Sequence, residues 1–173
     1  MGIRSLYIVL LLGIFSTVDA QFDGVELTVS RNNRIFSHSA GFDPGGNGAS
    51  LRAHAVFKIY DLYKAKIGAE LGANGIGNYL SSSMGVFRPI DLPGDKLSLT
   101  VGLTTQHGFA FFYPTGLYMM GFAEENTVYY HFKNGALVGL FVELRYFTSP
   151  GYAEISSINS FFDIQYGLKF SFL

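Results

Sequence analysis

Histidine is the side chain in this sequence with the widest use in catalysis, and the chain has 4 of them. His38 stands between two serines, and His107 lies near the end of a predicted strand. A histidine next to a serine can act as the general base that activates the hydroxyl for attack on an ester. His38 and His107 are therefore the candidate catalytic residues, and the chemistry that they suit is acyl hydrolysis with a serine from a loop.

The other histidines, His54 and His131, fall on the polar face of predicted strands, where we expect hydrogen-bonded structural roles. The segment that starts at His131 reads H-F-K-N-G-A-L and resembles the H-x-S-N-A-G motif of the lipid A deacylase barrels. Lys133 stands where that motif has its nucleophilic serine, which is a departure at the reacting position. A lipid-modifying acyl hydrolase is therefore an alternative hypothesis and not the first one.

Metal and cofactor sites are not predicted. The sequence has no H-x-x-x-H pair, and its D-P-G-G-N-G segment lacks the regularly spaced acidic residues of a calcium site. With Cys 0, disulfides and thiolate ligands are excluded. The net charge of −1 argues against nucleic acid as a partner, because that partner needs a basic surface.

A two-residue period runs through most of the chain and predicts strands. It is clearest in the last stretch, where apolar residues from Phe162 to Phe172 alternate with polar or small ones. Pro89 cannot donate to a ladder and predicts a bulge or an edge in the fourth strand. The fold class is all-β, an eight-stranded antiparallel up-and-down transmembrane β-barrel, with strands predicted at 25–31, 50–60, 66–74, 83–90, 96–109, 121–132, 136–147 and 161–173.

The connections between these segments alternate in length. Short links at 61–65, 91–95 and 133–135 follow the second, fourth and sixth strands, and longer links follow the others. In an up-and-down barrel this alternation places all short turns at one end and all long loops at the other. The third loop, at 110–120, is aromatic and Met-rich where a polar loop is expected.

The N-terminus has the pattern of a secretory signal peptide. Arg4 precedes a short apolar run, and small residues lead to Ala20, so cleavage is predicted there. This divides the chain into a signal peptide at 1–20 and a single barrel domain at 21–173. The composition agrees with a barrel that faces lipid, since aromatic residues make up 16% and charged residues only 14%.

The closing segment, F-F-D-I-Q-Y-G-L-K-F-S-F-L, resembles the last strand of bacterial outer-membrane β-barrels, which ends in an aromatic residue as Phe172 does here. The Ala-Gln cleavage boundary and the Trp-free strands look most like those of the Bacteroidota. The resemblance implies a Gram-negative outer membrane, with both termini periplasmic. It also implies insertion by the barrel-assembly machinery, contact with outer-membrane lipid and lipopolysaccharide, and possible membership of a larger complex.

A lipid-facing barrel turns its polar face inward, where charges must be paired. In the 50–60 and 66–74 hairpin we expect Glu70 to lie near Val56, flanked by His54 and Lys58. An eight-stranded barrel is filled by side chains, so we expect no open pore. The predicted interior polar network comprises Glu26, Arg52, His54, Lys58, Lys66, Glu70, Glu143, Arg145, Asp163 and Lys169.

Three functional hypotheses remain open from the sequence. The first is a structural, surface-binding or complex-accessory barrel, the second is the acyl hydrolase, and the third is a soluble lipocalin-like barrel that binds a ligand inside. The aromatic third loop is either a contact surface for a partner or lipid, or an extension of the two strands that it joins. Its candidate contact residues are Phe109, Phe111, Phe112, Tyr113, Leu117, Tyr118, Met119, Met120 and Phe122.

Overall fold

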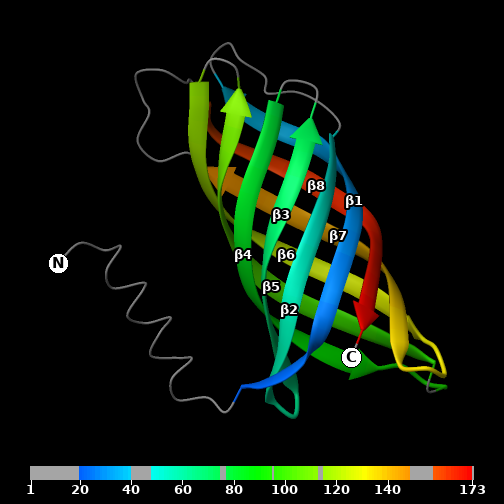
Figure 1. The fold of residues 1–173 in the computed structure, drawn as a ribbon. Helices are drawn as coiled ribbons and strands as arrows, with labels where there is room; N and C mark the ends of the chain where they lie inside the picture. Colours follow the sequence, from blue (N-terminus) through cyan, green and yellow to red (C-terminus); the bar gives the residue numbers. More distant parts are fainter. Residues whose placement is uncertain are drawn as a thin grey trace.

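A computed structural model describes residues 20–39, 48–74, 77–94, 96–112, 115–148 and 158–172. Eight antiparallel strands follow one another around a closed barrel (Figure 1), and β1 pairs with β8 to close it. No helix in these ranges is long and apolar enough to cross a membrane. The strands are β1 (Gln21–Ser39), β2 (Gly48–Tyr60), β3 (Tyr63–Asn74), β4 (Gly77–Asp91), β5 (Leu97–Phe112), β6 (Thr115–His131), β7 (Ala136–Thr148) and β8 (Ile158–Phe172).

The alternation of side chains along each strand separates an apolar outer wall from a polar interior. Leu103 on β5 and Leu140 on β7 are 67% and 68% exposed on the outer wall, whereas Glu70, Glu143 and Lys169 are 0% exposed inside. A soluble barrel has the opposite arrangement, because water favours a polar exterior. The wall is therefore suited to lipid.

Short turns join the strands at one end of the barrel. Two residues separate β2 from β3, and Lys133 to Gly135 lie in the turn before β7. In that turn Gly135 has φ 85°, a left-handed conformation that favours glycine, and the Phe132 amide donates to the Ala136 carbonyl at 2.9 Å. His131 pairs with Leu137 across this turn.

The strands extend further than predicted at the other end. β1 continues to Ser39 instead of ending at Arg31, and β4 already begins at Gly77. The predicted third loop is wrong, because β5 runs to Phe112 and β6 starts at Thr115. The turn-forming and aromatic residues at these strand ends form backbone ladders with neighbouring strands. Such long-range pairing overrides the local propensity of these residues for a loop.

Two predictions of local pairing are also wrong. Pro89 pairs with Thr100 in a regular register, so it causes no bulge in β4. Glu70 lies opposite Arg52, and Val56 lies opposite Lys66. The predicted register assumed a five-residue link, and the actual turn is shorter because Tyr63 already belongs to β3.

Candidate functional site

Two groups of charged side chains fill the barrel interior. The first, the arginine cluster, comprises Arg52, Glu70, Glu143, Arg145 and Asp163, and all of them are at most 5% exposed. Arg52 contacts Glu70 at 2.9 Å through Nε and Glu143 at 2.5 Å through Nη2. Arg145 donates to both oxygens of Asp163 at 2.7 and 2.9 Å and to Glu70 at 3.1 Å. Glu70 thus joins the two arginines into one network.

Neutral side chains complete the bonding around Glu70. The Tyr79 hydroxyl donates to its Oε1 at 2.6 Å, and the Gln165 amide donates to the same oxygen at 2.9 Å. The Gln165 amide also lies 2.5 Å from the Ser30 hydroxyl and 2.6 Å from the Ser50 hydroxyl. These residues come from four strands, β1, β2, β4 and β8, so the network connects distant parts of the barrel.

The second group, the lysine cluster, comprises Glu26, Lys66, Glu125 and Lys169. The Lys66 amine lies 2.9 Å from Glu26, and the Lys169 amine lies 3.2 Å from Glu26 and 2.5 Å from Glu125. The Tyr129 hydroxyl also donates to Glu26. Both lysines additionally lie over aromatic rings, which supplements the ion pairs in the buried interior.

The lysine and arginine clusters meet where Arg52 approaches Glu125 at 3.6 Å. Together they contain five carboxylates and four basic side chains, so acidic and basic groups are present in nearly equal number. Paired charges of this kind are tolerated in a low-dielectric interior only when both partners are present. These residues are at most 5% exposed, so at this level of the barrel they are packed against one another.

The interior network differs from the predicted one at two residues. Lys58 has the inward parity of β2, but it lies at the short-turn end, where its side chain is 47% exposed and contacts Asp61 at 2.9 Å. It is therefore not part of the interior network. Glu125 was missed, although it lies an even number of residues from inward-facing His131 and is 0% exposed. That parity was the signal available in the sequence.

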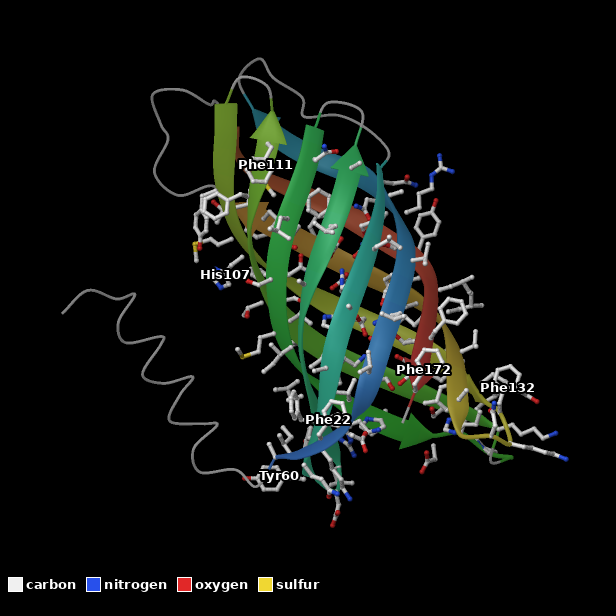
Figure 2. The ribbon with its side chains drawn as sticks, viewed as in Figure 1. Phe22, Tyr60, His107, Phe111, Phe132 and Phe172 are labelled. Carbon is white, nitrogen blue, oxygen red and sulfur yellow. The ribbon has the colours of Figure 1, made fainter. Side chains whose placement is uncertain are left out.

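The candidate catalytic residue His107 has no hydrogen bond to a serine side chain among the described residues. His107 lies within β5 on the outer wall (Figure 2), and its Nδ1 is 3.1 Å from the Tyr118 hydroxyl. Ser82, opposite it on β4, donates to the backbone carbonyl of His107 instead of the ring. His38 belongs to β1 and not to a loop, and its side chain lies outside the described part.

The inward histidines have hydroxyl partners. His54 Nε2 lies 2.8 Å from the Ser83 hydroxyl, and its Nδ1 lies 3.5 Å from Glu26 in the lysine cluster. His131 Nε2 lies 2.7 Å from the Ser98 hydroxyl. Ser83, His54 and Glu26 are at most 4% exposed, so this chain of hydroxyl, imidazole and carboxylate lies within the packed barrel interior.

Exposed aromatic rings gather near both ends of the outer wall. The lower belt, at the short-turn end, contains Phe22, Tyr60, Tyr130, Phe132 and Phe172, four of which are labelled in Figure 2. The upper belt contains Phe109, Phe111, Phe122 and Tyr146. Phe122 lies 5.4 Å from Tyr146, and Tyr130 lies 5.0 Å from Phe132. Aromatic belts at two levels are typical of barrels that span a bilayer.

The aromatic segment once expected as a loop is part of the upper belt. Phe109 and Phe111 are 52% and 55% exposed on β5, and the Phe109 and Tyr118 rings are 5.2 Å apart. Met120 faces outward, whereas Met119 is buried. The segment extends the hairpin of β5 and β6. The side chains of Phe112, Tyr113 and Leu117 lie outside the described residues.

No family model matches the sequence, and no curated protein matches it either. Neisserial surface protein A has a solved structure with a TM-score of 0.53 and 14% identity, and the match covers 87% of this chain and 98% of that one. The attachment invasion locus protein of Yersinia pestis matches with a TM-score of 0.49 and 10% identity over 86% and 97% of the chains. The N-terminal β-barrel domain of Pseudomonas aeruginosa OprF matches with a TM-score of 0.47 and 12% identity, and the match covers 89% of this chain and 100% of that one.

These structural neighbours are small eight-stranded outer-membrane β-barrels. At this level of identity the likeness concerns the fold alone, and the Neisserial protein has the highest TM-score of the three. The closed antiparallel barrel with an apolar outer wall agrees with it. The fold class is therefore that of an eight-stranded antiparallel β-barrel of the outer-membrane kind.

Proposed function

We propose that this chain is an integral protein of a Gram-negative outer membrane, a closed barrel without an open pore that has a structural, surface-binding or complex-accessory role. One observation carries this proposal: the apolar outer wall, with an aromatic belt near each end, is separated from an interior of buried, paired charges. Exposing such a wall to water is unfavourable, and an exposed apolar area of this extent marks contact with lipid or protein.

The orientation of the barrel follows from its ends. Gln21 and Phe172 both lie at the short-turn end, where β1 begins and β8 ends (Figure 1). Barrels of this kind keep short turns in the periplasm and longer loops outside. Both termini are then periplasmic, residues 1–20 serve as the export signal, and the barrel-assembly machinery inserts the mature chain. The upper belt contacts lipopolysaccharide or a partner in the outer leaflet.

Fractionation of the native membrane tests this proposal. We expect the protein to separate with the outer membrane, to need detergent for extraction, and to migrate differently on gels when it is not boiled. Recovery in the soluble periplasmic fraction would contradict the proposal.

A pair of variants tests the lipid contact itself. Leu140→Arg puts a charge on the lipid-facing wall and should reduce the insertion free energy by about 2–4 kcal/mol if the position lies near the middle of the bilayer. Leu62→Arg, in the turn between β2 and β3, is the control, since Leu62 is 59% exposed outside the strands. Equal yields of folded protein from the two variants would show that the wall does not face lipid.

A further inference from the structure

The outer wall contains three outward-facing charged side chains among those that the structure describes: Arg31 on β1, Arg88 on β4 and Glu124 on β6. Glu124 accepts a hydrogen bond from the Asn126 amide at 3.2 Å. Neither arginine has a hydrogen bond or an ion pair within the described part of the chain. A charged side chain that faces lipid is costly and marks a functional site unless a partner compensates it.

Glu124 lies between the two aromatic belts. Along the outer face of β6 it follows Phe122 of the upper belt and precedes Tyr130 of the lower belt. Its neighbours across the ladder are Leu103 on β5 and Leu144 on β7, both exposed. The carboxylate is thus surrounded by an apolar wall and has one neutral hydrogen-bond donor.

Arg31 lies at a similar depth on a different wall. One row of cross-strand pairs connects Asn126, Val142, Tyr166 and Arg31 through β6, β7, β8 and β1. In a barrel with strands tilted by about 40°, such a row rises about 3 Å per strand along the barrel axis, toward the end opposite the short turns. Arg31 therefore lies about 9 Å above Asn126 on this axis. Glu124 lies two residues above Asn126 on β6, which is about 5 Å. The difference of about 4 Å is within reach of an arginine side chain.

Arg88 lies at another depth. It is three residues from Asp91, where β4 ends at the short turns, whereas Glu124 is seven residues from His131, where β6 ends. Its long side chain can extend to the lower lipid headgroups. Arg88 therefore needs no protein partner, and Arg31 is the cation that matches Glu124.

Within one barrel Arg31 and Glu124 cannot meet, because β7 and β8 separate β1 from β6. Copies inserted in one membrane share orientation and depth, so side chains at equal depth on two walls face each other between neighbouring copies. We propose that the β1 wall of one copy docks on the β6 wall of the next, with Arg31 paired to Glu124. This inference rests on the proposed function, since it requires a barrel inserted in a membrane.

The surroundings of the two charges support this contact. Val29 and Leu51 beside Arg31 are 50% and 62% exposed, and Leu103 beside Glu124 is 67% exposed. Each charge is thus surrounded by apolar side chains. When two such patches meet, the apolar side chains exclude water from the ion pair that forms between them. Because the two patches occupy different walls, each copy has one neighbour on each patch, and the contact builds rows or closed rings.

Cysteine cross-linking in the native outer membrane tests the contact directly, since the chain has Cys 0. When β1 of one copy faces β6 of the next, β2 comes opposite β5. The double variant Leu51→Cys with Leu103→Cys should give a ladder of dimers, trimers and larger species with a short bis-thiol reagent. Each single variant should give none. Leu80→Cys with Leu103→Cys is the matched control, because Leu80 on β4 is 46% exposed and lies two strands away from β2.

Charge exchange tests the proposed pair on the cysteine background. Arg31→Glu or Glu124→Arg alone should lower the ladder yield at least about tenfold, because each places like charges together. The combined variant, with both changes, should restore the ladder. A structural role of either residue within its own barrel would not produce this rescue.

Several results would overturn the inference. They are dimers from a single-cysteine variant, which indicate a two-fold contact; cross-links to another protein only; and a folded barrel that gives no ladder. All three require the protein to be present and heat-modifiable in the outer membrane. If the proposed function is wrong, the protein is instead absent from the outer membrane. Failure of the contact and failure of the proposed function are therefore distinguishable.

Discussion

Glu70 is the carboxylate on which most side chains of the arginine cluster converge. Both arginines, the Tyr79 hydroxyl and the Gln165 amide donate to its two oxygens. A buried cation that loses its counter-charge retains its full desolvation cost. The stability of the cluster therefore depends on Glu70 more than on any single exposed ion pair.

Replacing Glu70 with leucine should destabilise the barrel. The Glu70→Leu variant leaves Arg52 and Arg145 to Glu143 and Asp163 alone, and we expect a loss of about 3–5 kcal/mol of unfolding free energy. Urea unfolding in lipid vesicles, read by gel mobility, measures it. Asp61→Asn is the control, because the Asp61 side chain is 95% exposed in its pair with Lys58 and should change little. Equal midpoints for the two variants would show that the cluster does not stabilise the fold.

At the residue scale, the two-residue period predicts which side chains point inward, but not how they pair. It places Arg52, Glu143 and Arg145 inside because each has apolar neighbours in sequence. It places Lys58 inside as well, because periodicity does not show where a strand leaves the barrel interior. The adjacent Glu124 and Glu125 have opposite roles, outward and inward, which only the strand's parity separates.

At the element scale, inward glycines make room for large side chains on the next strand. A Cβ built on Gly72 of β3 would lie 2.0 Å from the ring of Tyr79 on β4, the residue whose hydroxyl reaches Glu70. The glycine is thus a packing requirement of the β3–β4 hairpin and not a flexible point. The sequence shows the glycine, but its reason lies in a cross-strand contact.

A valine at this position should therefore displace Tyr79. We expect Gly72→Val to lower stability by about 1–3 kcal/mol, because the ring must leave its place and its bond to Glu70. Thermal unfolding followed by the gel mobility shift measures the change. Ala73→Val is the matched control, since Ala73 is adjacent but faces outward. If both variants melt together, the close contact of Gly72 and Tyr79 has no energetic consequence.

Strand number and order were predictable from the sequence, whereas strand length was not. Eight alternating segments and short turns such as Lys133 to Gly135 are local signals. The extension of β1 to Ser39, and of β5 and β6 into one hairpin, depends on pairing with strands distant in sequence. For the same reason the register of Arg52 with Glu70 required the true length of the turn after Tyr60.

At the scale of the whole molecule, the barrel is closed around its charges. The inward residues of all eight strands meet in the middle, and Arg52 and Lys169, among the longest side chains, are at most 2% exposed. An eight-stranded barrel has just enough width for such filling. The described strands therefore present an apolar outer wall to their surroundings.

Ion conductance tests this view of the molecule. In planar bilayers we expect no steady conductance from the unmodified protein, because ions cannot displace the paired side chains without breaking several buried bonds at once. Replacing the Arg145 and Asp163 pair together with serine removes opposite charges, keeps the net charge and leaves space for water, so intermittent conductance should appear. Leu140→Ala on the outer wall is the control and should remain silent. A steady conductance from the unmodified barrel would mean that the network opens in the bilayer, and the interior would then be a pathway instead of a core.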